Sequence, residues 1–576
     1  MQRRTHPVLV VLVVAAAFLA ASADAQRGQT PAEPRRPQVQ RPARDADRGV
    51  REEGTAAISG RVIAAGSGAP VRRARVVAAG ARRPHATTTD DQGRYQLPGL
   101  AAGTYTVSVS KAGFVESAFG QRRPLGPATP LQLSDGQHLT RVDVFMSRGG
   151  VITGHVRDEA GEPAARARVS AQRFVYVRGE RQLASAGSDE TDDRGQFRVF
   201  GLPPGDYFVS ATLRESEQTG LLLDALAARA RGAFPGRPAV AQQSTGYAPT
   251  YFPGTTIPSE AGALELAPSQ ELAGVDFQLQ LVRLASVQGS IAGTEGMVFL
   301  VPEDGRGFRS QGSRTSVRQD STFAITDVAP GNYTLVARVE GPDGDRMAIQ
   351  PIVVNGEDVT VTLVPVAGAR LRGTVTFESS GTPPPKDFQG FRVSAQRADR
   401  LPPIPRLGRP AQVTDTGAFA LSDLIPGRYL IQATGARGWT MKAVYLGGRD
   451  ITDEIVEITG DEARGLNVIF TDRATTLNGS VRDTHGAAAP GATVIAFPAD
   501  ATLWRPQTRR IQTARSDQNG RYRIGQLPPG EYLVAAVEDV EQGEWLDPEY
   551  LQLITNDASR MPLAEGEQKQ LDLTVR

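Results

Sequence analysis

The chain carries the stretch TDDQGRYQLPGLAAGTY at residues 89–105, and this stretch decides the fold. The Asp and Gly residues near its start favour a tight turn. Beyond it, Tyr105, Val107 and Val109 alternate with polar residues. A period of two predicts a strand with one buried face. We expect the ring of Tyr105 to pack in a core while its hydroxyl bonds a backbone group, as in a tyrosine corner.

The pattern occurs five times, with a Gly, one residue and a Tyr at identical offsets in every copy. These pairs are Gly103/Tyr105, Gly205/Tyr207, Gly331/Tyr333, Gly427/Tyr429 and Gly530/Tyr532. An aromatic residue precedes each tyrosine by ten positions: Tyr95, Phe197, Phe323, Phe419 and Tyr522. Each copy opens with a segment that has a central glycine: Gly60, Gly154, Gly289, Gly373 and Gly479. Each closes with a short alternating segment: 142–144, 275–277, 359–361, 466–468 and 571–573. Short strands between Gly, Pro and Asp turns predict one β-sandwich per copy.

The sequence therefore predicts an all-β chain of about five tandem β-sandwiches. The expected segments are a signal peptide (1–25), a disordered Pro/Arg-rich linker (26–55) and sandwiches at 56–148, 149–283 with an insertion at about 213–258, 284–366, 367–473 and 474–576. The linker has too few large apolar residues to offset its ordering entropy. The one good helix candidate, 220–231, lies in the insertion.

The N-terminus predicts export. Arg3 and Arg4 precede an apolar run from Val8 to Ala21, which an A-x-A motif at 23–25 follows. The run is shorter than the ~20 residues that span a bilayer, so a cleaved signal peptide is favoured over an uncleaved anchor. After cleavage we expect no membrane span, and an extracytoplasmic place in the periplasm, at the cell surface or in the medium.

Composition excludes several classes of function. The 64 Lys and Arg residues nearly balance the 63 Asp and Glu residues, so the basic field of a nucleic-acid protein is missing. With no cysteine, the chain has no disulfide, thiolate metal site or cysteine nucleophile. The sequence has no metalloprotease, nucleophile-elbow, P-loop or dinucleotide motif. We therefore predict no enzyme, catalytic residue, cofactor or metal site. Calcium at turn acids such as Asp90 and Asp91 is the weaker interpretation beside a turn-forming role, and an enzyme would need a carboxylate pair that meets only in space.

Aromatic residues outside the repeated positions are the best candidates for ligand binding. They are Trp439, Trp504, Trp545, Tyr247 and Tyr251. Sugar rings stack on such faces, so one hypothesis is a glycan platform. The alternative is that the rings plug joints between domains or staple long loops. An open cluster of the tryptophans would favour the first, and their burial between domains the second.

Several segments resemble one known family, the carboxypeptidase regulatory-like domain. They are Pro70–Val76, Thr89–Tyr95, Leu97–Tyr105, Thr191–Phe197 and Leu202–Tyr207, together with the matching parts of the fifth copy. The resemblance implies that each copy is a seven-stranded, Ig-like or prealbumin-like sandwich of the transthyretin-like, starch-binding-like and Cna-B-like group. Such a domain is typically a non-catalytic accessory module of exported bacterial proteins. We therefore expect a binding protein, with carbohydrate as the specific hypothesis and a polysaccharide or a cell-envelope protein as partner. The alternative is a structural stalk or protein-interaction scaffold without a small ligand. The sequence leaves the oligomeric state open.

Overall fold

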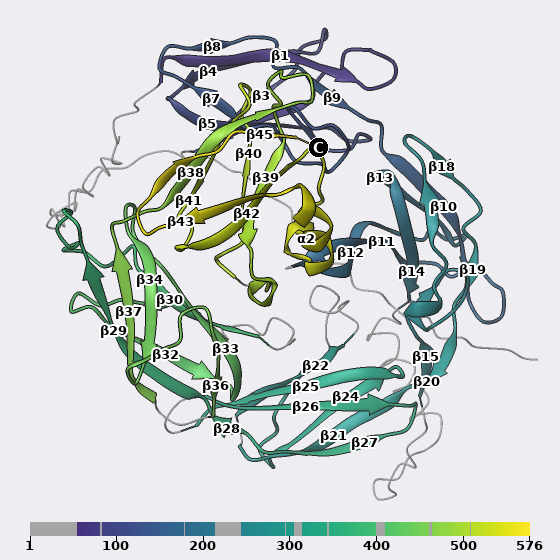
Figure 1. Cartoon of the computed structure of the whole chain (residues 1–576). Coiled ribbons are helices and arrows are strands. Elements are labelled where there is room, and N and C mark those ends of the chain that lie inside the picture. The colour runs from purple at the N-terminus through teal and green to yellow at the C-terminus, as the bar shows by residue number, and fades with distance from the viewer. Residues whose placement is uncertain are drawn as a thin grey trace, which may run out of the picture. The chain divides into compact units, whose positions relative to one another are not determined.

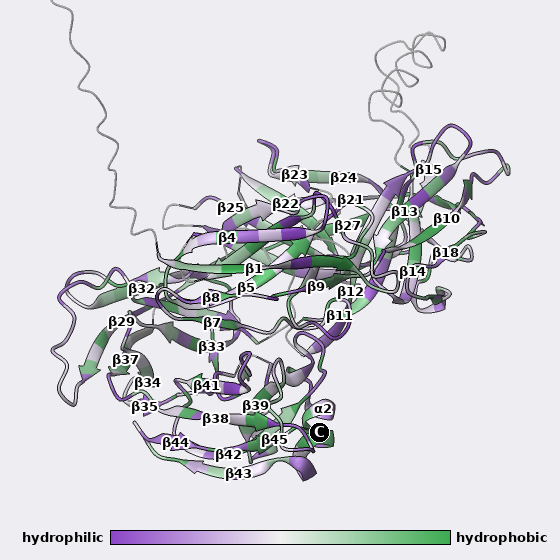
Figure 2. Ribbon diagram, turned by 90° about the horizontal axis from the view of Figure 1, so that it is seen from above, coloured by the Kyte–Doolittle hydropathy of each residue, from purple (hydrophilic) through white to green (hydrophobic). Residues whose placement is uncertain are grey.

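The computed structural model describes residues 54–80, 83–177, 179–213, 244–293, 295–303, 314–341, 345–398, 409–459, 463–506 and 508–575. The expected signal peptide, the linker up to residue 53 and the helix candidate 220–231 lie outside the described residues. The described chain folds as tandem all-β sandwiches, as predicted (Figure 1). Buried and exposed residues alternate along strands such as Arg94–Leu100 and Gln196–Leu202, so these strands give one face to a core. Figure 2 colours the ribbon by the hydropathy of each residue.

The first sandwich closes two sheets over a core that contains Ile58, Val76 and Val107. One sheet pairs β1 (Ala56–Ala64) with β4 (Arg94–Leu100), β8 (His138–Leu139) and β9 (Val144–Met146). The other has the order β3 (His85–Thr88), β2 (Arg75–Gly80), β5 (Gly103–Ser110), with β6 (Ser117–Ala118) and β7 (Leu131–Leu133) both pairing with β5.

The second sandwich repeats this plan and adds a long hairpin. Its first sheet pairs β10 (Gly150–Arg157) with β13 (Gln196–Leu202), β18 (Glu271–Leu272) and β19 (Phe277–Gln278). Its second sheet contains β12 (Glu180–Glu190), β11 (Arg168–Val177), β14 (Gly205–Thr212), β16 (Thr250–Tyr251) and β17 (Leu264–Leu266). A separate pair joins β15 (Thr245–Tyr247) to β20 (Leu281–Arg283), and η1 (Pro258–Glu260) is a short 3-10 turn. The hairpin β11–β12 extends well beyond the sheet partner β14.

The third and fourth sandwiches distribute their strands differently. The sheets of the third are β24 (Thr322–Val328), β21 (Ala285–Ile291), β27 (Val359–Leu363), and β23 (Arg314–Ser316), β22 (Gly296–Pro302), β25 (Gly331–Val339), β26 (Arg346–Val354), β28 (Val366–Ala367). Those of the fourth are β32 (Ala418–Leu424), β29 (Ala369–Glu378), β37 (Ala463–Thr471), β34 (Thr440–Leu446), β35 (Arg449–Asp450), and β31 (Ala411–Gln412), β30 (Arg392–Arg397), β33 (Gly427–Thr434), β36 (Ile455–Ile458).

The fifth sandwich adds a helical cover. Its sheets are β41 (Arg521–Gly525), β38 (Thr476–Arg482), β44 (Gln568–Gln570), β45 (Leu573–Thr574), and β40 (Gln512–Arg515), β39 (Thr493–Pro498), β42 (Gly530–Val537), β43 (Ser559–Leu563). The helical elements are η2 (Ala501–Leu503), η3 (Glu544–Leu546), α2 (Pro548–Ile554) and η4 (Thr555–Asp557). The sequence analysis missed α2, although Asp547 as N-cap and Pro548 at the first helical position are local start signals.

All five repeated tyrosines form the predicted corner. Each hydroxyl donates to the carbonyl oxygen four residues earlier: Tyr105 to Ala101 (3.0 Å), Tyr207 to Pro203 (2.6 Å), Tyr333 to Ala329 (2.9 Å), Tyr429 to Ile425 (2.7 Å) and Tyr532 to Pro528 (2.7 Å). The bond lets a large ring enter the core without an unsatisfied hydroxyl. The corner prediction is confirmed.

A glycine stands at the centre of each opening strand for the same physical reason in all five copies. A Cβ at that position would meet a carbonyl oxygen of the closing segment at 2.1 Å for Gly60, 2.0 Å for Gly154, 1.8 Å for Gly289, 2.3 Å for Gly373 and 1.8 Å for Gly479. Only a residue without a side chain lets the closing segment approach so closely.

The turn acids serve the backbone. Asp90 Oδ1 accepts the N–H groups of Gln92 (2.9 Å) and Arg94 (2.8 Å), and the latter bond holds the pKa of Asp90 below its usual value. Asp192 and Asp517 accept equivalent pairs of N–H groups. The structure thus gives these carboxylates the turn-forming role.

Candidate functional site: the joints of the fifth sandwich

The aromatic candidates do not form one open platform. Trp439 is 5% exposed in the core of the fourth sandwich, and Tyr251 is 1% exposed in the second. Trp504 is 9% exposed and donates from Nε1 to the carbonyl of Pro498 at 2.8 Å. Trp545 is half-buried beside Trp504, and half-buried Tyr247 bonds the carboxylate of Glu159 through its hydroxyl. Trp439, Trp504 and Tyr251 are thus buried, whereas Trp545 and Tyr247 are half-buried.

The Trp504 cluster is a second core of the fifth sandwich. Strand β39 buries residues on both of its faces, so Ile495 and Phe497 point away from the main core. Trp504 and Leu551 of α2 cover them, and the rings of Phe497 and Trp504 meet edge to face at 5.7 Å. Trp504 therefore anchors the segment between β39 and β40 to the sheet. This agrees with the alternative hypothesis, in which such rings staple long loops.

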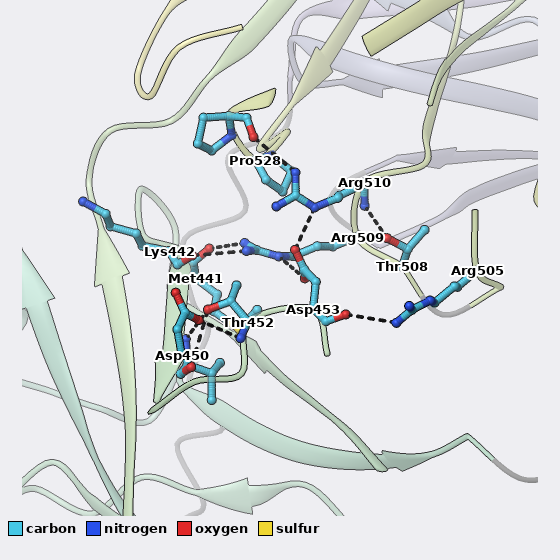
Figure 3. A network of polar contacts seen from close by, with 12 residues as sticks. Met441, Lys442, Asp450, Thr452, Asp453, Arg505, Thr508, Arg509, Arg510 and Pro528 are labelled. Carbon is cyan, nitrogen blue, oxygen red and sulfur yellow. Dashed lines mark hydrogen bonds and ion pairs between the residues drawn. The ribbon is translucent and has the colours of Figure 1, made fainter. Parts of the chain in front are cut away.

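A charged joint connects the fourth and fifth sandwiches (Figure 3). Asp453, in the turn after β35, receives Arg509 Nε on Oδ1 at 2.8 Å and Arg510 Nε on Oδ2 at 2.9 Å. Its carbonyl oxygen accepts from Arg505 at 3.4 Å. The side chains of Asp453, Arg509 and Arg510 are only 13%, 18% and 21% exposed. One carboxylate thus compensates two guanidinium groups that are largely shielded from water.

The same joint reaches the backbone and a second ion pair. Arg509 donates to the carbonyl oxygens of Met441 and, at 3.1 Å, Lys442. The ammonium of Lys442 lies 2.6 Å from Glu378 of its own sandwich and 3.1 Å from Glu565 of the fifth. Hydrogen bonds to Glu378 and Glu565 raise the pKa of Lys442, so this lysine stays charged.

A second charged joint connects the first and fifth sandwiches, whose sequences are four hundred residues apart. The loop between β6 and β7 carries Arg122 and Arg123, which pair with Glu538 and Asp539 after β42. Arg123 also lies 3.4 Å from Glu541. These side chains are between a third and a half exposed, so each pair alone contributes little.

Close packing strengthens this joint. Gly491 has a φ of +78°, and a Cβ there would lie 2.5 Å from Oγ1 of Thr129 in the first sandwich. Nearby, Gln132 donates its N–H to Gln518 Oε1, and Gln518 Nε2 donates to the Gln132 carbonyl, both at 2.9 Å. Arg515 donates to the Gly491 carbonyl at 2.7 Å, and burial lowers its pKa to about 10. The two sandwiches therefore meet through backbone contacts as well as charges.

The hairpin β11–β12 joins the second sandwich to the fifth. A Cβ at Gly543 would lie 2.9 Å from the carbonyl oxygen of Tyr176, and one at Gly179 would lie 2.5 Å from that of Leu546. Arg173 approaches Glu541 at 3.7 Å. Burial raises the pKa of Tyr176, and the negative charge of Glu544 raises it further. The fifth sandwich thus contacts the first, second and fourth.

Sequence reasoning missed these joint residues, but a comparison of the copies contains the signal. The position of Gly491 is Arg73 in the first copy and Arg166 in the second, and all three donate their N–H to the residue before the turn acid. Gln518 likewise stands where Asp91 and Asp193 stand. The fifth copy thus departs from the repeat at two of the positions where the first sandwich touches it.

Within the described residues, no three His, Asp or Glu side chains gather where they could hold a metal ion. No helix in the same part of the chain is long and apolar enough to cross a membrane.

Two segments match the carboxypeptidase regulatory-like domain, residues 57–147 and 476–575. The first and fifth sandwiches therefore belong to this family, which confirms the resemblance. No curated protein matches the chain by sequence.

The chain also has matches among solved structures, with low sequence identity and low TM-scores. The TIE protein of Bacillus anthracis is 12% identical, with 74% of each chain covered and a TM-score of 0.14. A streptococcal ancillary pilin is 11% identical, covering 51% of this chain and 99% of its own, with a TM-score of 0.18. Two B repeat units of the collagen-binding protein of Staphylococcus aureus are 9% identical, covering 72% and 99%, with a TM-score of 0.12. Similarity at this level supports no inference about function.

Proposed function

We propose that the chain is a non-catalytic scaffold exported to the cell envelope, in which the fifth sandwich fixes the positions of the others. The observation that carries the proposal is the Asp453 joint, in which one carboxylate holds two largely buried guanidinium groups of the next sandwich. The sandwiches at 56–148, 149–283, 284–366, 367–473 and 474–576 are its building units. Export rests on the signal sequence at residues 1–25.

The cost of removing the charges of this joint from water supports a fixed arrangement of the two sandwiches. Moving charges out of water is unfavourable, and only good geometry offsets that cost. Asp453 meets this condition with one short contact per oxygen, and Arg509 also uses backbone carbonyls. A flexible string of domains would leave these charges in water, whereas a scaffold benefits from their defined direction.

Protein partners fit this proposal better than carbohydrate. The carbohydrate hypothesis rests on the resemblance to starch-binding-like domains and on accessible aromatic faces. Of the aromatic candidates, Trp439, Trp504 and Tyr251 are buried, and Trp545 and Tyr247 are half-buried. Loops held by fixed sandwiches suit protein surfaces, since rigid presentation lowers the entropic cost of binding.

The test uses the mature chain from residue 26 to residue 576 and a panel of soluble and insoluble polysaccharides. Small-angle X-ray scattering on the same sample reports whether the sandwiches hold one arrangement. We expect no saturable polysaccharide binding, and a scattering profile that fits one conformation. Saturable binding that Trp504→Ala or Trp545→Ala abolishes would establish a carbohydrate module instead. A profile that requires many conformations would contradict the fixed scaffold.

A further inference from the structure

The joint between the first and fifth sandwiches has two parts that recur elsewhere in the chain. One part is a loop, residues 119–130 between β6 and β7. The other, which we name the fifth corner, consists of residues 489–493 and Glu538, the residue that follows β42. Loop and corner meet at Thr129 and Gly491 and at Arg122 and Glu538.

The second sandwich has an equivalent loop, residues 252–263 between β16 and β17. It has the same length of twelve residues as 119–130. Its flanking strands pair with β14 in the register that β6 and β7 keep with β5. One internal bond is also shared, because Gly262 donates to the Phe252 carbonyl and Thr129 to the Phe119 carbonyl, both at 2.8 Å.

The first sandwich has an equivalent corner. The first corner consists of residues 71–75 and Lys111, which follows β5 as Glu538 follows β42. The ammonium of Lys111 donates to the Arg72 carbonyl, so the two segments lie together. Arg72, Arg73 and Arg75 are all exposed.

The second loop and the first corner are complementary in charge, with the signs of the existing joint reversed. The first loop is basic and its corner acidic. In the second loop, Thr255 replaces Arg122 and donates to the carboxylate of Glu260 at 2.8 Å. The first corner places Lys111 where the fifth corner has Glu538. A carboxylate therefore stands where the first loop has a guanidinium, and an ammonium where the fifth corner has a carboxylate.

The two surfaces are also complementary in size. In the existing joint, Thr129 of the loop meets a corner residue without a side chain, Gly491. In the second loop the position of Thr129 is Gly262, and in the first corner the position of Gly491 is Arg73. A Cβ at Gly262 would already lie 3.4 Å from the ring of Phe252, so the longer side chain of Arg73 needs room beside Gly262 and not at it. The second loop borders a hollow of about 440 Å³ lined by Pro253, Gly254, Thr255, Glu260, Gln278 and Gln280. Gln278 donates from Nε2 to the Glu159 carbonyl at 2.8 Å, which holds one wall of the hollow in place.

We propose that the first corner of one copy docks into the loop at 252–263 of a second copy, so that the chain self-associates head to tail. The contact repeats between molecules what the first loop and the fifth corner do within one. It rests on the proposed function in one respect, since it names the protein partner of the scaffold. A head-to-tail contact uses different surfaces on the two partners, so it can add further copies. Asp91 in place of Gln518 accepts a hydrogen bond but donates none, so the contact is weaker than the joint it copies.

Sedimentation velocity of the mature chain over a concentration series tests this inference. We expect reversible association that weakens with salt. Lys111→Glu and Glu260→Lys should each weaken it by about tenfold in dissociation constant, and the double variant, in which the only available pair has its signs swapped, should recover association. Arg437→Glu and Glu357→Lys, exposed charges on other sandwiches, serve as matched controls and should leave association unchanged.

Three outcomes would overturn the inference: a monomer at every concentration, association that both charge reversals leave intact, or equal loss in the control variants. Small-angle scattering of the monomer separates this failure from that of the proposed function. A monomer with one fixed conformation would remove the self-association and keep the scaffold. A monomer with many conformations would remove the scaffold itself.

Discussion

The joint between the third and fourth sandwiches differs in chemistry from the joints of the fifth. Val336, Met347 and Ile425 form a small buried apolar cluster, with Phe299 and Ile349 packed against it. The fifth sandwich instead meets the fourth through Asp453 and its arginines. Apolar contacts are non-directional, whereas paired charges are satisfied in few orientations. The comparison shows that two neighbouring sandwiches can associate by apolar burial alone, whereas the contacts of the fifth sandwich with the fourth and with the first use paired charges, which restrict orientation.

The largest effect is expected at the charged joint. Asp453→Ala leaves Arg509 and Arg510 largely buried without their carboxylate, which should cost about 3 kcal/mol of docking free energy between the fourth and fifth sandwiches. Hydrogen exchange of the segment 505–512 measures the opening. Glu357→Ala, an exposed carboxylate in the third sandwich, is the matched control. Unchanged exchange in Asp453→Ala would mean that the joint contributes no stability.

A comparable loss is expected at the apolar joint, but with a different salt response. Ile425→Ala removes a buried side chain, which should cost about 2 kcal/mol in docking of the third and fourth sandwiches. Its effect should be the same in low salt and in about 1 M NaCl, where the Debye length falls to about 3 Å. Hydrogen exchange of β25 and β26 at both ionic strengths checks this. A strong salt dependence would remove the distinction between the two kinds of joint.

A third variant isolates the contact at Gly491. Gly491→Ala and Gly486→Ala both place a side chain at positive φ, +78° and +82°, but only the first meets a neighbour, since nothing lies within 4 Å of a Cβ at Gly486. Both should lose about 1 kcal/mol of local stability, and Gly491→Ala about 1–2 kcal/mol more. Exchange of the amide of Gln132, which donates to Gln518, measures the difference. Equal hydrogen exchange in the two variants would show that Thr129 moves aside at no cost in free energy.

The smallest effect concerns the tyrosine corners at high pH. Burial raises the pKa of Tyr207 and of Tyr532 to about 12. The folded state therefore holds these protons more tightly than the unfolded state, whose tyrosine pKa is about 10. Stability from this source is complete below about pH 10 and is lost as the pH rises toward 12. Tyrosinate absorbance should rise for these residues near pH 12, and a Tyr532→Phe variant should lack its share. Ionisation of Tyr532 near pH 10 in the folded protein would contradict its burial.

The repeated parts of the fold were predictable from the sequence because each copy solves the same local problem. The tyrosine corner needs a fixed offset between a carbonyl and a ring, so it leaves an invariant spacing. The closing carbonyl would lie about 2 Å from a Cβ on the opening strand, so it leaves an invariant glycine there. The class of fold follows directly from them.

The joints were not predictable in the same way. Asp453 and Arg509 lie in connecting segments that do not repeat from copy to copy. Their contact depends on how two separate sandwiches pack against each other. The burial of Trp504 was not predictable either, because this residue covers the outer face of β39, where alternation along one strand does not reveal a second core. Departures from the repeat, as at Gly491 and Gln518, were the signal that could have located one joint.

The most direct test of the account measures whether the fifth sandwich fixes the first. The chain has no cysteine, so single cysteines at exposed Ala65 and Thr484 take spin labels without a competing thiol. Double electron–electron resonance should give one narrow distance distribution in the parent chain, broadened when Arg123→Ala and Asp453→Ala are combined. A distribution that is already broad in the parent chain, or that stays narrow in the double variant, would contradict the claim that these charged joints hold the sandwiches in place.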